Sequence, residues 1–126
     1  MGQRILVVDD EEQMRQLLSL YLSKQGYRVS TAASSAEALQ QIAQTPFHLV
    51  VVDIGLANED GLHLLAYLKA EHPKLRVVML TGMGFMEELL QEANQKGADG
   101  YVSKGLPLQE LHLAIQNVLN RSHTST

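Results

Sequence analysis

The chain has 126 residues and a formal net charge of −4, which fits one domain of ordinary size and excludes the strongly basic surface of a nucleic-acid-binding domain. Apolar residues make up 45% of the chain, enough to build a core, so intrinsic disorder is excluded as well. It has no cysteine, which excludes disulfides and thiolate metal sites, and its N-terminal apolar run is far too short for a signal peptide or a membrane span. We therefore expect a soluble cytoplasmic domain that binds no membrane.

The first predicted element is a strand over residues 5–8, because four consecutive apolar residues are typical of a strand buried on both faces. Four acids follow it at once. Apolar residues then recur at helical spacing over 11–25, and Gly26 is suited to end that helix. A short strand is expected next, over 27–32.

The middle of the chain repeats this alternation. Ser34 and Glu37 form the S-x-x-E pattern of a capping box, which predicts a helix that runs to about Gln44. Residues 47–52 are the most apolar run and predict the central strand. The remaining predicted elements are, in order, a helix over 61–71, a strand over 75–80, a helix over 85–96, a strand over 101–103 and a helix over 107–119.

Five strands that alternate with five helices indicate an α/β fold, a parallel sheet wound on both faces. In such sheets the ligand lies beyond the carboxyl ends of the strands. Four of the five predicted strands end in polar residues suited to chemistry. These are Asp9 and Asp10 after the first strand, Asp53 after the third, Thr81 after the fourth and Lys104 after the fifth.

Taken singly, each of these residues has an ordinary structural interpretation. Acids at a helix start are often caps that complement the helix dipole. Asp53 would be a loop residue, Thr81 a capping hydroxyl and Lys104 a solvated lysine. The joint occurrence at one edge of the sheet favours a functional site, and three clustered carboxylates suit a hard divalent cation.

The segments "ILVVDDEEQMRQLL", "LVVVDIGLANEDGLHLL", "VVMLTG" and "GADGYVSKGLPLQEL" together resemble the receiver domain of two-component response regulators. The resemblance spans residues 4 to about 119. It implies a flavodoxin-like sheet of strand order 2-1-3-4-5, with residues 1–120 as the receiver domain and 121–126 as a polar tail or truncated linker.

The resemblance also implies a Mg²⁺ site. Asp10 would bind the metal directly and Asp9 through water. Asp53 would be both a ligand and the phosphoryl acceptor, and the backbone carbonyl of Gly55 would complete the protein's share of ligands.

In the same way, the resemblance gives catalytic and switching roles to three further residues. Thr81 and Lys104 would contact phosphoryl oxygens. Thr81 and Tyr101 would change position on phosphorylation and alter the face formed by the fourth helix, the fifth strand and the fifth helix. The implied donor is a histidine kinase or phosphotransfer protein, and the implied receiver of the signal is an output domain or a downstream protein.

The pattern departs from the family at two positions. Ala57 stands where a proline is usual, which loosens the loop but removes no ligand. Lys104 is followed by Gly105 instead of proline, and a proline comes only at 107. A cis bond before a residue other than proline costs about 2.5–4 kcal/mol, so we expect a trans Lys104–Gly105 bond. If activation is conventional, the Lys104 ammonium should still lie within salt-bridge reach of Asp53.

Three functions remain open at this point. The first is a phosphorylation-switched signalling domain, which catalyses only its own phosphorylation and slow dephosphorylation. The second is a Mg²⁺-dependent aspartyl phosphatase, which usually needs a second acid where this chain has Gly55. The third is a pseudo-receiver that binds a partner without phosphorylation. The histidines are scattered and match neither a metal nor a phosphotransfer motif: His48, His63, His72, His112 and His123.

Overall fold

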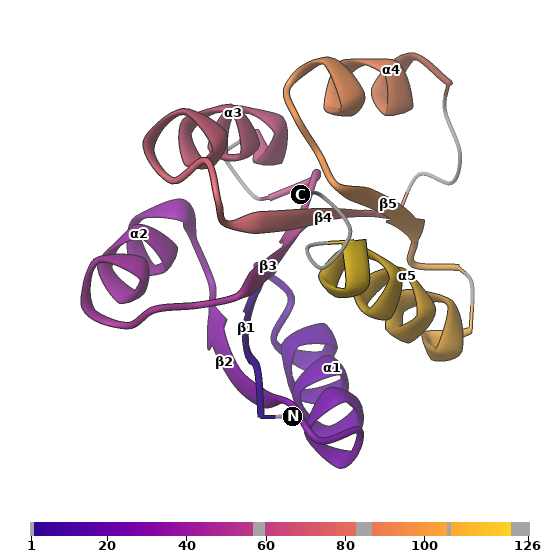
Figure 1. Ribbon diagram of the computed structural model, residues 1–126. Coiled ribbons are helices and arrows are strands. Elements are labelled where there is room, and N and C mark those ends of the chain that lie inside the picture. The colour runs from indigo at the N-terminus through magenta and orange to yellow at the C-terminus, as the bar shows by residue number, and fades with distance from the viewer. Residues whose placement is uncertain (1, 57–59, 83–86, 106, 122–126) are drawn as a thin grey trace.

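The computed structural model describes residues 2–56, 60–82, 87–105 and 107–121. Strands and helices alternate along them (Figure 1). The strands are β1 Arg4–Val8, β2 Arg28–Ala32, β3 Leu49–Asp53, β4 Arg76–Thr81 and β5 Gly100–Ser103. The helices are α1 Glu12–Lys24, α2 Ser35–Gln44, α3 Gly61–Glu71, α4 Glu87–Gln95 and α5 Leu108–Arg121.

The five strands form one parallel sheet of order β2-β1-β3-β4-β5, which confirms the predicted topology. β3 is central, as its apolar sequence predicts, and all five of its residues are buried. The winding reverses between β1 and β3, so the first and third strands lie side by side. The carboxyl ends of β1 and β3 therefore meet at one edge of the sheet.

Successive residues of each strand point to opposite faces, and each face has its own core. Figure 1 shows α1 and α5 on one face and α2, α3 and α4 on the other. On the α1–α5 face, Val51 and Leu80 pack with helix residues such as Ile115. On the α2–α4 face, Val52 and Met79 pack with residues that include Leu65. Because helices cover both faces of the sheet, the ends of the strands are where a functional site can form.

The helix ends follow the predicted signals, with one difference. Gly26 and Gly97 end α1 and α4 with positive φ angles of 101° and 97°, which glycine adopts without strain. The Ser34 hydroxyl accepts from the Glu37 amide at 3.2 Å, as a capping box requires. The Glu37 side chain, however, reaches back to the amide of Ala33 and not to that of Ser34.

Some element boundaries differ from the predicted ones by one or two residues. β3 begins at Leu49 instead of 47 and includes Asp53 as its last residue. The helix expected over 11–25 begins at Glu12, with Glu11 at the N-cap. α5 extends to Arg121, one residue into the predicted tail, and residues 122–126 lie outside the described residues.

Candidate functional site

The carboxyl edge of the sheet brings together the residues that the sequence places after four strands. Asp9 follows β1, Asp53 ends β3, Thr81 ends β4, and Lys104 follows β5. Three of them, Asp53, Thr81 and Lys104, line a small pocket of about 300 Å³. Its lining consists of Asp10, Glu11, Asp53, Gly55, Thr81, Gly82 and Lys104. The predicted convergence of these residues is thus present in the fold.

Three carboxylates form the acidic part of this site. One oxygen each from Asp9, Asp10 and Asp53 lies within 4.8 Å of the other two. Asp9 is fully buried and Asp53 is 4% exposed, whereas Asp10 is exposed. Burying two carboxylates so close together is costly unless a cation balances them.

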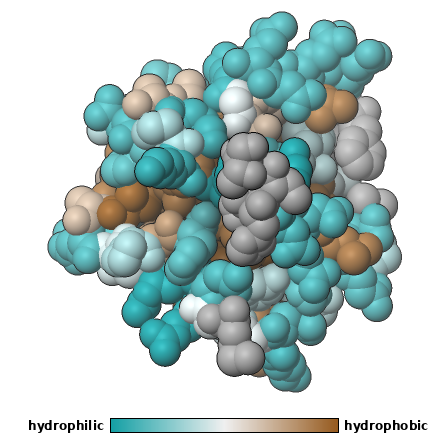
Figure 2. All heavy atoms as spheres, viewed as in Figure 1, coloured by the Kyte–Doolittle hydropathy of each residue, from teal (hydrophilic) through white to brown (hydrophobic). Residues whose placement is uncertain are grey.

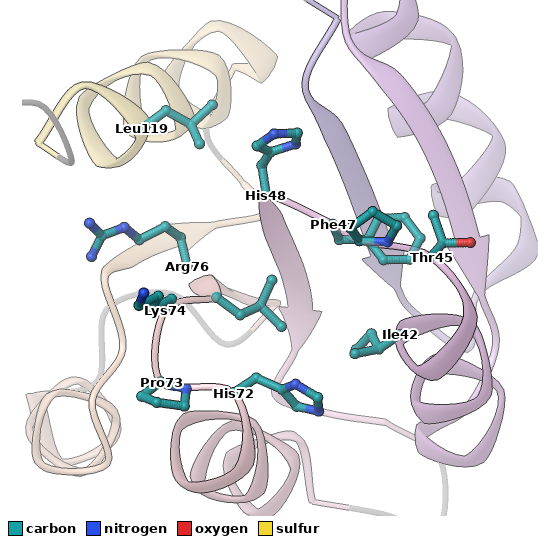
Figure 3. A pocket seen from close by; sticks show the side chains of 11 residues that line it. Ile42, Thr45, Phe47, His48, His72, Pro73, Lys74, Arg76 and Leu119 are labelled. Atoms are coloured by element: carbon teal, nitrogen blue, oxygen red, sulfur yellow. The ribbon is translucent and has the colours of Figure 1, made fainter.

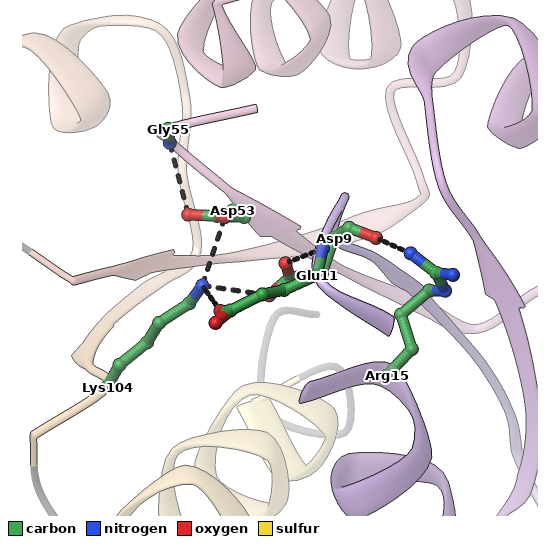
Figure 4. A network of polar contacts seen from close by, with 6 residues as sticks. All are labelled: Asp9, Glu11, Arg15, Asp53, Gly55 and Lys104. Atoms are coloured by element: carbon green, nitrogen blue, oxygen red, sulfur yellow. Dashed lines mark hydrogen bonds and ion pairs between the residues drawn. The ribbon is translucent and has the colours of Figure 1, made fainter. Parts of the chain in front are cut away.

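Lys104 supplies a cation from within the protein (Figure 4). Its ammonium lies 2.9 Å from Asp9 Oδ2 and 3.0 Å from Asp53 Oδ2, and Glu11 Oε1 is 3.5 Å away. The expected contact with Asp53 is therefore made without the family proline. The structure has no cis peptide bond among its described residues, so the Lys104–Gly105 bond is trans, as expected.

The loop that carries Lys104 is held by two backbone contacts. The Lys104 amide donates to the carbonyl of Thr81 at 2.7 Å, which ties the loop to the end of β4. The Gly105 amide donates to Ser103 Oγ at 3.2 Å. These bonds aim the lysine at the acids in place of the ring of a proline.

The site shifts the ionisation of both Asp53 and Lys104. Burial raises the pKa of the Asp53 carboxyl, and Asp9 raises it further, against the opposing effect of hydrogen bonds from Lys104 and Gly55. Burial by itself would lower the pKa of the Lys104 ammonium, but contacts with Asp9 and Asp53 outweigh it and raise that pKa. Lys104 is therefore a stable positive charge in the site.

Backbone groups hold the acids in position. The Gly55 amide donates to Asp53 Oδ1 at 3.1 Å, and the Glu11 amide donates to Asp9 Oδ1 at 2.9 Å. Arg15 Nη1 donates to the carbonyl of Asp9 at 2.6 Å. Asp9 and Asp53 thus each have one carboxylate oxygen fixed by a backbone amide and the other close to the Lys104 ammonium.

A tight contact also fixes the backbone of the acceptor. A Cβ atom built on Gly61, the first residue of α3, would lie 2.2 Å from the carbonyl oxygen of Asp53. The Gly61 amide donates to the carbonyl of Ile54 at 3.0 Å. Only glycine allows α3 to begin this close to the end of β3.

The sequence prediction missed three residues of this site as individual contributors. Glu11 was part of the acid block, but only the fold brings it to Lys104. Arg15 and Gly61 carry no local signal, because their partners are backbone carbonyls that the fold places beside them. Spacing in the sequence does not reveal such contacts.

The residues of the site fit a divalent cation. Asp9 Oδ2 is buried and accepts no aligned hydrogen bond, although it forms an ion pair with the Lys104 ammonium. A buried carboxylate oxygen without an aligned donor is suited to ligate a metal, and three clustered carboxylates provide the oxygen ligands that such ions prefer. The acid cluster is therefore consistent with divalent metal binding.

The two predicted switch residues occupy neighbouring strands. Thr81 is 1% exposed at the end of β4. Tyr101 pairs with Met79 across β4 and β5, is half-buried, and packs against the core on the α2–α4 face. Ala57, and the methionines at 83 and 86 of the β4–α4 connection, lie outside the described residues.

A larger pocket lies at the amino edge of the sheet. Figure 2 shows hydrophobic residues gathered in a hollow between α2 and α3. The pocket has a volume of about 830 Å³ (Figure 3). Its lining is apolar and basic, without an acid: Ile42, Thr45, Pro46, Phe47, His48, His72, Pro73, Lys74, Leu75, Arg76 and Leu119. It lacks the acids that form the cluster at the carboxyl edge.

The described histidines take structural positions. His48 accepts a hydrogen bond from the Arg4 amide at 3.0 Å, and His112 makes edge contacts with the rings of Tyr21 and Tyr27. His63 is exposed. Among the described residues, no helix has the length and apolar character required to span a bilayer.

Comparisons with known proteins agree with this fold. Among curated proteins, the transcriptional regulatory protein SrrA of Staphylococcus aureus is 30% identical over all 126 residues. The chain spans about half of that relative, 52% of its length. A CheY-like receiver domain protein from Methanospirillum hungatei is 28% identical, with a TM-score of 0.91 and complete coverage of both chains.

Two other solved structures contain ligands. A response regulator from Burkholderia pseudomallei has a phosphorylated aspartic acid, a calcium ion and citrate; it is 30% identical, with a TM-score of 0.84 over 98% of this chain and 72% of that one. The response regulator TrrA of Thermotoga maritima is in complex with Mg²⁺ and BeF; it is 29% identical, with a TM-score of 0.82 over 92% of this chain and 98% of that one.

The family whose profile matches residues 5–116 is described as the response regulator receiver domain, a signalling domain of two-component systems. The matched segment includes every strand residue from Ile5 onward and each residue of the acid and lysine cluster. The chain therefore belongs to the response regulator receiver domain family.

Proposed function

We propose that this domain accepts a phosphoryl group on Asp53 from a histidine kinase or phosphotransfer protein and passes the signal on through α4, β5 and α5. One observation carries the proposal. A single ammonium, that of Lys104, lies 3.0 Å from the carboxylate of Asp53 and 2.9 Å from that of Asp9, next to a pocket open to solvent. This arrangement supports Asp53 as the nucleophile, because a positive charge that can hold phosphoryl oxygens lies beside its carboxylate.

The metal of the site is Mg²⁺ in this proposal. The carboxylates of Asp9, Asp10 and Asp53 and the carbonyl of Gly55 would hold it. When bound, Mg²⁺ neutralises phosphoryl charge and fixes the acceptor relative to the donor. The Mg²⁺ and BeF bound to T. maritima TrrA support this choice, and the B. pseudomallei protein contains a phosphorylated aspartic acid and a calcium ion, which supports a divalent cation more generally.

The residues of the chain perform the transfer. An Asp53 carboxylate oxygen forms a bond to phosphorus while the bond from phosphorus to the donor atom breaks, and the leaving group keeps the electron pair. Lys104 stabilises one phosphoryl oxygen as a point charge, and the Thr81 hydroxyl donates to another. Water later attacks phosphorus, which breaks the bond to the Asp53 oxygen and releases inorganic phosphate, so phosphorylation is followed by slow dephosphorylation.

Phosphorylation adds about −1.5 to −2 charge units to the site. Thr81 would move toward the new oxygens, and Tyr101 on the neighbouring strand would turn inward with it. The face formed by α4, β5 and α5 then changes shape. We propose that an output domain or a downstream protein receives this change; the chain spans 52% of the length of SrrA. We place the domain in the cytoplasm, without direct nucleic-acid or membrane contacts.

Two other functions are less well supported. An aspartyl phosphatase usually needs a second acid two residues after its nucleophile, but this chain has Gly55 at that position, and its backbone amide donates to Asp53. A pseudo-receiver would be favoured by a lysine that points away from the acceptor, whereas Lys104 contacts Asp53. Both observations favour a domain that is itself phosphorylated.

Intact mass spectrometry after incubation with acetyl phosphate and Mg²⁺ distinguishes the three functions. We expect a single phosphoryl adduct that decays slowly and does not form when EDTA is present. Rapid multiple turnover of acetyl phosphate without an adduct would indicate a phosphatase. An unchanged mass with acetyl phosphate, with phosphoramidate and with a phosphorylated histidine protein would indicate a pseudo-receiver.

A further inference from the structure

Glu11 has a position that its role as a helix cap does not explain. It is the N-cap of α1, but its side chain makes no capping hydrogen bond. Its carboxylate instead lies 3.5 Å from the Lys104 ammonium, 93 residues along the chain. Figure 4 shows the Glu11 side chain extended toward Lys104, beside the contacts that this ammonium makes with Asp9 and Asp53.

This carboxylate lies at the mouth of the site. Glu11 lines the same pocket as Asp53, Thr81 and Lys104. Its side chain is 63% exposed, whereas the side chains of Asp9 and Asp53 are 0% and 6% exposed. Any phosphoryl donor that reaches Asp53 through this pocket therefore passes close to the Glu11 carboxylate.

The charge of Glu11 has opposite effects on the two kinds of ligand that the proposed function requires. Like charges repel, so an exposed carboxylate slows the approach of a free anionic donor. The same carboxylate attracts a divalent cation. Because Glu11 is exposed, both effects are modest and decrease as salt screens them.

We propose that Glu11 is a specificity-determining residue that disfavours small anionic phosphodonors and favours divalent cations at the mouth of the site. This inference rests on the proposed function, since it concerns the donors of the same site. It leaves the domain less responsive to free acyl phosphates. Donor proteins depend less on the charge of the pocket mouth, because their contacts with the surface outside it hold the phosphoryl group in place.

The test compares Glu11→Gln with wild type for two donors of different charge. Acetyl phosphate is a dianion at neutral pH, and its transfer breaks the P–O bond and releases acetate. Phosphoramidate is largely a monoanion, and its transfer breaks the P–N bond and releases ammonia. At saturating Mg²⁺ and low salt we expect phosphorylation to become about threefold faster with acetyl phosphate and less than about twofold faster with phosphoramidate.

The matched control is Glu12→Gln, which removes the same charge one residue along the chain. Glu12 lines a different pocket, with Arg15 and Thr31. We expect phosphorylation by acetyl phosphate to be accelerated less in this variant than in Glu11→Gln. Glu11→Lys reverses the charge and should enlarge the preference for acetyl phosphate over phosphoramidate, and the effects of all three variants should shrink as salt is raised.

Mg²⁺ affinity, measured by calorimetry without a donor, is the second readout. Glu11→Gln should weaken binding by about twofold, so the metal effect and the donor effect have opposite signs. Loss of the folded structure would instead lower both the Mg²⁺ affinity and the rate of phosphorylation. Equal acceleration with the two donors, or the same acceleration in Glu12→Gln, would overturn the role of Glu11. Failure of the proposed function looks different, because wild type itself would then form no adduct with either donor.

Discussion

At the carboxyl edge of the sheet one base is surrounded by acids, and at the amino edge one acid is surrounded by bases. Lys104 contacts Asp9, Asp53 and Glu11. Asp99, just before β5, has Lys69 Nζ at 3.1 Å and Arg76 Nη1 at 3.7 Å.

The backbone around Asp99 completes the contrast. The Val77 amide donates to the Asp99 carboxylate at 2.9 Å, and Arg121 donates to the Asp99 carbonyl. The protein thus satisfies Asp99 fully, and its ion pairs connect α3, β4 and β5. At the carboxyl edge one ammonium cannot neutralise several carboxylates, so negative charge remains available for an added cation. The same type of contact therefore stabilises the fold at one edge and prepares a site at the other.

Asp53→Asn gives the largest expected difference between the two edges. We expect this variant to form no phosphoryl adduct with acetyl phosphate and Mg²⁺, because its amide is not a nucleophile, while the fold stays intact. Intact mass spectrometry measures the adduct, and circular dichroism checks the fold. Asp99→Asn is the control and should label like wild type. Undiminished labelling of Asp53→Asn would contradict the assignment of the acceptor.

Asp10→Ala tests whether the surplus charge at the carboxyl edge binds the metal. Loss of a carboxylate ligand should weaken Mg²⁺ binding by on the order of 10- to 100-fold, as measured by calorimetry. Without metal, the free energy of unfolding should stay level or rise, because repulsion between the remaining acids decreases. An unchanged Mg²⁺ affinity would mean that the metal binds elsewhere or not at all.

Asp99→Asn tests the structural character of the amino edge. The amide can still accept from Val77, but the ion pairs with Lys69 and Arg76 are lost, so we expect a loss of about 1–2 kcal/mol in the free energy of unfolding. Urea denaturation in EDTA measures it. Lys96→Gln, which removes the partly exposed pair with Glu92, should cost less than about 0.5 kcal/mol. Equal losses in both variants would show that Asp99 is no better placed than a surface acid.

The smallest expected effect is the pH dependence of Asp53 itself. Because the pKa of Asp53 is raised above its ordinary 3.8, the folded state binds its proton more tightly than the unfolded chain does. The charged form of Asp53 therefore lowers the free energy of unfolding. This loss is complete above the folded-state pKa and absent below the ordinary pKa. In EDTA, Asp53→Asn should be more stable than wild type at pH 7, and this gain should vanish as pH falls through that window. A gain that persists unchanged to low pH would contradict the raised pKa.

Much of the fold could be predicted from the sequence, because its signals are local. Apolar runs predicted the strands, helical spacing predicted the helices, and Gly26 predicted the end of α1. The strand order came from the family resemblance rather than from the residues. The boundaries of β3 and α5 were misplaced by one or two residues, since the sequence does not show where sheet pairing begins or where a helix loses its last contact.

The acids and Lys104 could be predicted because each follows a strand, and parallel strands end at one edge. Their geometry could not. Replacement of the family proline by Gly105 left the position of the lysine open, and the bond from the Lys104 amide to Thr81 settles it in the fold. Contacts of side chains with distant backbone, such as that of Arg15, depend on the whole tertiary structure.

The contacts of Lys104 also determine when the site forms during folding. Lys104 is 51 residues from Asp53 and 93 from Glu11, and β5 is the last strand among the described residues and the edge strand beside β4. Ribosomal synthesis produces Asp9 and Glu11 directly after β1 and Asp53 with β3, whereas Lys104 follows only after β5. Contacts across such spans form late, because the entropy of closing a long loop opposes them. The nascent domain therefore carries its acids without their lysine until the final strand joins the sheet.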